Sequence, residues 1–413
     1  MVKTEKIPEG YRATETGILP VDWQVKRLSE VATELTERAG QDKYETVSIS
    51  AGIGFVNQAE KFGKELSGKQ YEKYIVLHQG DFSYNKGNSK TSPQGCIYCL
   101  NDRETAAVPN VFESFRVEGQ NAGYYEQLFL SGFLNKQLYS KINRGVRDDG
   151  LLNLTGKDFY SCTVPVPPIA EQKKIAEVLS CCDRVIELKQ QLIIELQQLK
   201  NGFLQAMFPA KGHSEPDIRF PEFSDAWKQR KLYEVAEFNP KSELPEEFEY
   251  VDLESVVGTE MVSHRTEKRV TAPSRAQRLA QTGDVFFQTV RPYQKNNYLF
   301  AKPDKFYVFS TGYAQMRPKI DAEYLMCFLQ TDSFVKVVLD NCTGTSYPAI
   351  NSNDLSNLEI ALPGSKDEQR RIGSLVTKLD HLITLHQQEL EETKKKKKSL
   401  AKLLLTGSVR VPT

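Results

Sequence analysis

The sequence lacks several features that would assign it to common protein classes. It has no excess charge, because 54 Lys and Arg residues balance 54 Asp and Glu residues over 413 positions. This balance excludes a histone-like protein or one built on a basic tail, although local basic patches can still bind phosphate. No apolar run approaches the roughly 20 residues that span a membrane, and the polar start shows no signal peptide. Seven cysteines, an odd number, indicate a reducing, cytoplasmic setting.

Motifs for catalysis and cofactor binding are missing as well. There is no phosphate-binding G-x-x-x-x-G-K-[ST] loop, and residues 52–57 lack the third glycine of a dinucleotide-binding loop. Asn239-Pro240 lacks the following aromatic residue that base-modifying methyltransferases use. Cys96 and Cys99 have a metal-like spacing, but in a strand their side chains face opposite sides. The sequence therefore predicts no catalytic residue, no metal site and no cofactor in this chain, and favours recognition or scaffolding.

An internal repeat organises the chain. The pattern W-x4-L-x-E-V-A occurs at residues 23–32 and again at residues 227–236, and the chain has only two tryptophans. Residues 171–208 align without gaps onto residues 368–405, with identity at 10 of 38 positions. The step Gly-Asp followed by an apolar residue also recurs, at positions 80–82 and 283–285. A period of about 200 residues is too long for a solenoid and indicates a duplicated domain pair.

Each copy begins with a segment typical of a compact α/β (α+β) domain. Short β-branched and aromatic runs alternate there with Gly, Asn and Pro, which predicts strands separated by turns. The expected strands include residues 74–77, 96–100, 284–287 and 306–309, and one helix is expected in each domain, over residues 124–142 and 323–339.

Each copy ends in a long helix with a heptad pattern. Steps of 4 and 3 residues from Ile175, and again from Ile372, fall mostly on apolar residues over more than four heptads. A sustained period of 3.5 residues is a coiled-coil signature, so we expect the two helices to pair with each other. The alternative is that each amphipathic helix lies on its own domain. The predicted seam comprises Ile175, Leu179, Ile186, Ile193, Leu196, Phe203, Ile372, Val376, Leu379, Ile383, Leu390 and Leu400.

Polar, basic and aromatic residues gather in loops at corresponding points of both domains. Lys and Arg side chains contact phosphates or guanine edges, Asn and Gln read adenine, and Ser and Thr anchor the backbone. Each loop alone is typical of a solvated turn, but their recurrence in a duplicated domain favours DNA binding. The candidate residues are Tyr84, Asn85, Lys86, Asn88, Ser89, Lys90, Arg144 and Arg147 in the first domain, and Thr289, Arg291, Tyr293, Lys295, Thr345, Ser346 and Tyr347 in the second.

The order of these motifs resembles the specificity subunit of type I restriction-modification systems. The resemblance covers the chain from about Leu19 to Gly407 and includes two proline-preceded helix starts, at Pro167 and Pro363. It implies two target-recognition domains, each reading half of a bipartite site in double-stranded DNA, with an antiparallel coiled coil between them. It also implies that chemistry belongs to partners: two modification subunits that methylate adenine with S-adenosylmethionine, and restriction subunits that use ATP with Mg²⁺.

On this basis the chain divides into seven segments. They are an N-terminal arm (1–20), a first recognition domain (21–165), a first spacer helix (166–208), a linker (209–222), a second recognition domain (223–362), a second spacer helix (363–407) and a tail (408–413). The two recognition domains with their spacer helices are expected to be related by a pseudo-twofold axis. The helices are expected to set the spacing of a split target and to dock the modification subunits. Two other hypotheses are a coiled-coil adaptor without a DNA ligand and an enzyme with an unrecognised active site.

Overall fold

The computed structural model describes residues 7–63, 68–87, 92–142, 152–209, 213–302 and 304–412. The chain forms two compact units. The first comprises Met1–Lys189 with Leu390–Thr413, and the second comprises Gln190–Glu389. Each long helix contributes part of its length to each unit, so the first unit is built from two separate pieces of the chain and the second from one continuous piece. Within the described residues no helix is long and apolar enough to cross a membrane.

The first unit is built on a four-stranded antiparallel sheet. Its strand order is β4-β11-β8-β9, formed by Ala32–Glu34, Glu113–Val117, Phe82–Asn85 and Cys96–Cys99. One face of the sheet is lined with aromatic side chains: the Phe82 and Phe115 rings stack 5.3 Å apart, and Phe129 meets Phe82 edge-on at 5.5 Å. Alternate residues of a strand point to the same face, so this pattern places the main core on one side of the sheet.

Shorter elements complete the first unit. Strand β3 (Gln24–Arg27) pairs with β12 (Thr163–Val166) and so joins the beginning of the domain to the start of its long helix. The remaining elements are the hairpins β1–β2 (Tyr11–Thr14, Gly17–Pro20) and β5–β6 (Val47–Ser50, Gly54–Asn57), the pair β7–β10 (Ile75–His78, Thr105–Val108), helices α1 (Gln58–Phe62) and α4 (Gly156–Tyr160), and the 3₁₀ turns η1 (Leu28–Glu30) and η2 (Gly68–Lys73).

The second unit repeats this scaffold. Its sheet has the order β14-β23-β20-β21, formed by Ala236–Phe238, Tyr313–Pro318, Val285–Gln288 and Tyr298–Leu299. Strand β13 (Lys228–Lys231) pairs with β24 (Glu359–Leu362), as β3 does with β12. A second four-stranded sheet is added, with the order β18-β15-β22-β19, formed by Arg265–Lys268, Glu247–Val251, Tyr307–Ser310 and Ala276–Leu279. Smaller elements are β16 (Val256–Val257), β17 (Glu260–Met261), α6 (Leu232–Val235), η3 (Pro292–Gln294) and α9 (Ser352–Ser356).

Each domain has two short helices where one was expected. In the first unit, α2 (Ala122–Leu130) and α3 (Asn135–Lys141) are separated at Gly132, whose φ of +76° is left-handed and favours glycine. In the second, α7 (Ala322–Leu329) and α8 (Asp332–Asp340) are separated by Thr331, whose side chain caps α8 by accepting a hydrogen bond from the Phe334 amide. The prediction of a single helix over 124–142 and 323–339 was wrong, because apolar periodicity continued across both breaks.

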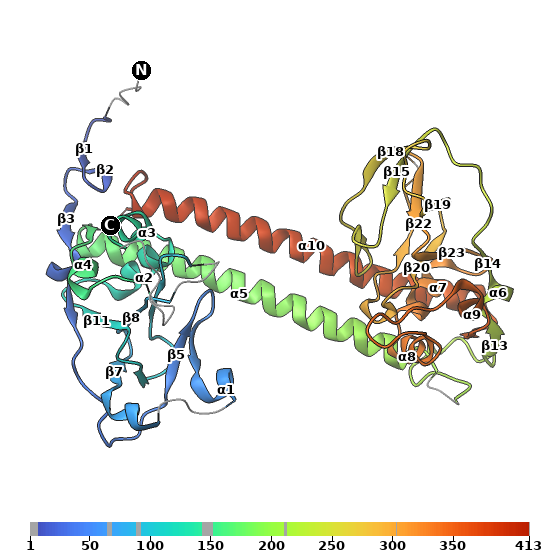
Figure 1. Cartoon of the computed structure of the whole chain (residues 1–413), viewed down its shortest axis with the longest axis horizontal. Helices are drawn as coiled ribbons and strands as arrows, with labels where there is room; N and C mark the ends of the chain where they lie inside the picture. Colours follow the sequence, from blue (N-terminus) through green and yellow to red (C-terminus); the bar gives the residue numbers. More distant parts are fainter. Residues whose placement is uncertain are drawn as a thin grey trace. The chain divides into compact units, whose positions relative to one another are not determined.

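The long helices are α5 (Ile169–Ala206) and α10 (Lys366–Leu405) (Figure 1). Within each unit they run antiparallel. In the first, Lys397 of α10 binds Asp183 of α5 at 2.5 Å, and in the second, Lys200 of α5 binds Asp380 of α10 at 2.7 Å. The 171–208/368–405 alignment places Asp183 on Asp380 and Lys200 on Lys397. The two ion pairs are therefore the same interaction, repeated once in each unit. The predicted fold class, a duplicated α/β domain with two antiparallel long helices, is confirmed.

The seam residues are shielded along both helices. Ile175 and Ile372 are 0% and 1% exposed, and the sequence-predicted seam contains no exposed residue. The ends of the helices do more than pair. Ile175 and Leu179 join the aromatic core of the first unit together with Leu404 of α10, and Ile372 joins the corresponding core of the second. Both hypotheses for these helices thus describe part of the packing: pairing with each other and packing on a domain.

One glycine in each unit permits the long helix to approach the domain closely. A Cβ on Gly373 of α10 would lie 2.7 Å from the backbone nitrogen of Tyr324 in α7. In the first unit the small residue is on the other side of the contact, since a Cβ on Gly123 of α2 would lie 3.3 Å from the Cβ of Ala176 in α5. The backbones can come this close only because one partner at each contact lacks a side chain.

Candidate DNA-recognition surface

The repeated Gly-Asp step holds the sheet rather than facing a ligand. Asp81 is 1% exposed and receives two hydrogen bonds from Arg116 of β11, at 2.6 and 2.9 Å. Asp284, also 1% exposed, receives two from Arg317 of β23, at 2.9 and 3.0 Å. Hydrogen bonding to the two aspartates raises the pKa of both arginines. These bidentate pairs, each with a buried aspartate and a partly exposed arginine, fix where a central strand of each sheet begins, and therefore where the loop after it emerges.

In the first unit, the described part of the predicted loop supports the fold. Tyr84 is fully buried, its ring stacks 4.8 Å from Phe159, and its hydroxyl donates to the Gln94 carbonyl. Burial raises the pKa of Tyr84, so it stays neutral. The side-chain oxygen of Asn85 accepts from the Gly87 amide at 2.8 Å. The side-chain nitrogen of Asn85 donates to the Ile49 carbonyl at 3.2 Å, so both side chains are engaged within the domain.

Lys86 is also engaged within the first unit. Its ammonium group lies 2.9 Å from the Glu113 carboxylate, and the two side chains are 16% and 14% exposed. The Lys86 carbonyl accepts a hydrogen bond from the Leu152 amide, so the start of the first predicted loop lies beside a residue that follows the second in the sequence. The other candidates of this domain lie outside the described residues: Asn88, Ser89, Lys90, Arg144 and Arg147.

In the second unit, the structure brings the two predicted loops together. The Arg291 amide donates to the Pro348 carbonyl at 2.8 Å, and Val290 forms a bridge with Ala349. The Arg291 guanidinium lies over the Tyr347 ring, 4.2 Å from its centroid, and Tyr347 is 66% exposed. The cation–π contact orients the guanidinium, and Arg291 is partly exposed.

We define the Arg291–Tyr347 patch as the accessible candidates of these two loops. Its members are Arg291, Tyr293, Thr345, Ser346 and Tyr347. Arg291 has a φ of +53°, a left-handed conformation that is uncommon for a residue with a side chain. Residues held in such conformations cluster at functional sites. The patch combines an arginine, two hydroxyl-bearing residues and two tyrosines, of which Tyr293 is 49% exposed. These residue types are typical of contacts to DNA.

Two further candidates of the second unit have structural partners. Thr289 is 7% exposed, and its hydroxyl donates to the Gly312 carbonyl at 2.8 Å. Lys295 also has a left-handed φ, of +54°, and its ammonium group lies 2.6 Å from Asp332. That hydrogen bond lowers the pKa of Asp332. Thr289 therefore belongs to the base of the loop, while Lys295 fastens the loop to α8.

The repeated tryptophans belong to a cluster that the sequence did not reveal. The Trp23 indole donates to Glu171, a carboxylate 1% exposed at the start of α5, at 2.9 Å. Arg410 donates two hydrogen bonds to the same carboxylate, at 2.6 and 2.7 Å. We call these three residues the first Trp–Glu–Arg cluster. Arg410 lies in the segment described above as a tail, which is therefore part of the structure of the first unit.

The second Trp–Glu–Arg cluster is Trp227, Glu368 and Arg219. The Trp227 indole donates to Glu368 at 3.3 Å, and Arg219 donates to it at 2.7 and 2.9 Å. Arg219 lies in the segment described as a linker. The tryptophan and glutamate of each cluster are identical in the repeat, but the two arginines do not align in it. Because the two arginines lie at different sequence distances from their glutamates, the repeat alone does not predict the clusters.

The cysteines of the metal-like spacing are isolated from other ligands. Cys96 is half-buried, and burial raises the pKa of its thiol to about 11, so it is protonated at neutral pH. Burial also raises the pKa of Cys99. Over the part of the chain that the structure describes, no three His, Cys, Asp or Glu side chains form a group that could hold a metal ion.

Comparison with known proteins identifies the class to which this scaffold belongs. The family model of the type I restriction modification DNA specificity domain matches residues 20–198 and 225–395. The chain belongs to this family. It is a DNA specificity subunit with two target-recognition domains, and such a subunit is itself non-catalytic. The resemblance inferred from the sequence is thereby confirmed, and the adaptor and enzyme hypotheses are not supported.

Similar proteins match over most or nearly all of the chain. The putative type I restriction enzyme MjaX specificity subunit of Methanocaldococcus jannaschii is 24% identical, with 98% of each chain covered. The MjaVIII specificity subunit of the same organism is 27% identical over 69% of this chain and 70% of that one. The fold is similar to the S subunit of a type I restriction-modification system from M. genitalium, with a TM-score of 0.58, 13% identity and 97% coverage of both chains.

Proposed function

We propose that each recognition domain reads one half of a bipartite DNA target, and that the two half-sites differ in sequence. The observation that carries this proposal is the contrast between scaffold and loops. The sheets β4-β11-β8-β9 and β14-β23-β20-β21 share strand order and the bidentate Asp–Arg pair, whereas the loops after their central strands differ in residue type. A shared scaffold positions loops in the same way, and different loops present different hydrogen-bonding groups to base edges.

The Arg291–Tyr347 patch is the proposed reading surface of the second domain. Arginine recognises guanine through two parallel hydrogen bonds in the major groove, which requires a guanidinium held in a fixed plane. The Tyr347 ring supplies that plane, and the exposed hydroxyls of Thr345 and Ser346 are available to phosphates or bases. In the first domain, the corresponding contacts are assigned to Asn88, Ser89, Lys90, Arg144 and Arg147.

Replacing Arg291 by alanine is expected to weaken binding to the intact target about 5- to 150-fold, equivalent to about 1–3 kcal/mol, and to relax the preference at one base pair of the second half-site. Tyr347→Ala should act on the same base pair with a smaller loss of about 2- to 5-fold, because only the orientation of Arg291 is lost. Fluorescence anisotropy with the assembled methyltransferase complex measures both effects.

The matched control is Arg230→Ala, which removes the same charge from β13, where Arg230 is half-exposed beside Glu234. This change should leave both affinity and base preference unaltered. If Arg291→Ala changes neither the affinity nor the preference at any base pair of the target, the patch is not part of the DNA interface.

The partners are proposed to dock on the long helices. Val185 and Leu188 of α5 are 40% and 53% exposed in the first unit, and Leu382 and Leu385 of α10 are each 40% exposed in the second. These residues correspond pairwise in the 171–208/368–405 alignment, so the same apolar face occurs once in each unit. We define these four residues as the duplicated docking face. Repeated exposed apolar residues mark an interaction site, and two equivalent faces suit two modification subunits.

The remaining functions are assigned to these partners. S-adenosylmethionine for adenine methylation would be bound by the modification subunits, and ATP with Mg²⁺ by restriction subunits. The long helices are proposed to set the length of an unread spacer between the half-sites. Helix α5, with 38 residues, is about 57 Å long at 1.5 Å per residue, compared with about 34–36 Å for one turn of DNA.

A further inference from the structure

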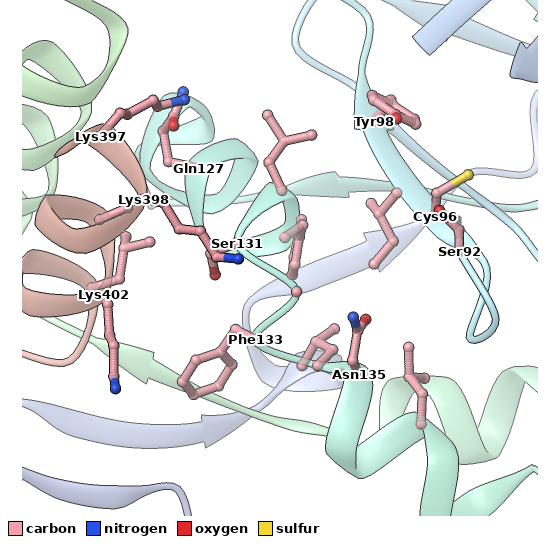
Figure 2. Close-up of a pocket in the computed structure, with 18 of the residues that line it drawn as sticks. Ser92, Cys96, Tyr98, Gln127, Ser131, Phe133, Asn135, Lys397, Lys398 and Lys402 are labelled. Atoms are coloured by element: carbon pink, nitrogen blue, oxygen red, sulfur yellow. The ribbon is translucent and has the colours of Figure 1, made fainter. Parts of the chain in front are cut away.

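A large pocket in the first unit lies between α10 and the β8–β9 hairpin. Its volume is about 690 Å³. Figure 2 shows Lys397, Lys398 and Lys402 on one side of it and Ser92, Cys96 and Tyr98 on the opposite side. All the charged residues that line the pocket are lysines of α10, with Lys394 as the fourth, and no acidic side chain is among the described residues of its lining. The pocket therefore has the electrostatic character of an anion-binding site.

Two of the four lysines are already engaged. Lys397 forms the ion pair with Asp183 at 2.5 Å, and Lys394 lies 2.7 Å from Glu391 on its own helix. Lys398 and Lys402, in contrast, are exposed, and their ammonium groups make no ion pair or hydrogen bond within the described part of the chain. They are four residues apart, which places them on one face of α10, about 6 Å apart along its axis.

The repeat separates the structural lysine from the others. Lys397 corresponds to Lys200 of α5, which makes the equivalent ion pair with Asp380 in the second unit. Lys398 and Lys402 correspond to Asn201 and Gln205, which are uncharged. The ion pair thus belongs to the common architecture, whereas Lys398 and Lys402 have no charged counterpart at the equivalent positions of α5.

The opposite wall connects this site to DNA reading. Ser92 and Gly95 belong to the connection between β8 and β9, which also contains the candidates Asn88 to Lys90. Gln127 and Asn135 also line the pocket; in Figure 2 Gln127 lies beside Lys397, and its side-chain nitrogen donates a hydrogen bond to Asp183 at 2.9 Å. A phosphate backbone that crosses the β8–β9 connection at Ser92 and Gly95 would therefore pass close to the unpaired lysines.

We propose that Lys398 and Lys402 bind phosphates of the DNA strand beside the half-site read by the first domain. The proposal rests on the proposed bipartite function and adds to it an electrostatic contact made by the helix. Duplex DNA is favoured over an acidic protein segment because the cores of protein interfaces are depleted of lysine, whereas DNA interfaces are strongly positive. The equivalent positions of the second unit, Asn201 and Gln205, carry no charge, so we expect the two ends of the target to be held with unequal salt dependence.

The test replaces these lysines by their counterparts from the other copy, Lys398→Asn together with Lys402→Gln, in the assembled complex with modification subunits. Removing two phosphate contacts should lower the slope of log K against log salt by about 2, since each contributes about 0.9. At physiological salt the affinity should fall about three- to tenfold, equally for target and non-target DNA.

The matched control is Lys395→Gln with Lys396→Gln, which removes the same charge from residues of α10 that do not line the pocket. An equal loss of slope in this control would overturn the proposal in favour of diffuse attraction. An unchanged slope in the test variant, with weaker binding of modification subunits by sedimentation, would overturn it in favour of a protein partner. Failure of the bipartite function itself appears separately, as wild-type complex binding equally well to DNA that lacks one half-site.

Discussion

Replacing Arg410 by alanine is expected to lower the free energy of unfolding of the first unit by about 2–4 kcal/mol. Glu171 is 1% exposed, and after the change its carboxylate keeps only the Trp23 indole as a donor from this cluster. Breaking a fully buried ion pair costs about 3–5 kcal/mol. The value expected here is lower because Arg410 is 41% exposed, which lets water reach part of the vacated site.

The tryptophans provide the measurement. The chain has two, one in each Trp–Glu–Arg cluster, so the fluorescence of Trp23 in a Trp227→Phe background reports on the first unit during urea unfolding. Arg184→Ala is the control, because this arginine is 69% exposed beside Glu187 and should contribute less than about 1 kcal/mol. A loss for Arg410→Ala no larger than that of the control would contradict the role given to the cluster.

Introducing glutamate at both Leu188 and Leu385 is expected to abolish assembly with the modification subunits, with a loss of at least about 100-fold in affinity. Each change places a charge in the centre of a proposed apolar interface, where truncating a single important residue already costs about 2–4 kcal/mol. Leu188→Glu alone should leave a complex with one modification subunit, since the duplicated docking face occurs once in each unit. Light scattering after gel filtration distinguishes these stoichiometries by mass.

Val270→Glu is the control for the docking variants. Val270 is 89% exposed and lies outside the duplicated docking face, so its variant should assemble normally. The thermal unfolding of the free chain should be unchanged in all three variants, because every substituted residue is exposed. A Leu188→Glu, Leu385→Glu chain that still binds two modification subunits would show that they dock elsewhere.

The sequence was most informative where a pattern is local and periodic. The heptads of α5 and α10 predicted both helices, because one period of apolar residues determines one buried face. The same reliance on periodicity failed at Gly132 and Thr331, where apolar residues continue across a break that only backbone conformation reveals. The repeat itself could be recognised from the sequence because both copies keep the tryptophan and the glutamate of their Trp–Glu–Arg cluster.

The candidate site was harder to predict because residue type does not report burial. Tyr84 and Tyr347 both lie in segments that the sequence predicts to be polar loops, yet one is fully buried and the other is 66% exposed. Tyr84 lies two positions after Phe82 in β8 and so shares its core-facing side, a signal present in the strand period. The partners of Asp81 and Glu171, by contrast, lie far away in the sequence, and no local sequence pattern predicts them.

The most direct test of the central claim, that two domains read a split DNA target, is single-molecule sequencing of adenine methylation in the genome of a host that carries this chain with its modification subunits. We expect one methylated motif composed of two different half-sites separated by an unread spacer of fixed length. Exchanging residues 223–362 for the second recognition domain of a related subunit should change only one half-site. A continuous methylated motif, or a motif in which both halves change on that exchange, would contradict the account.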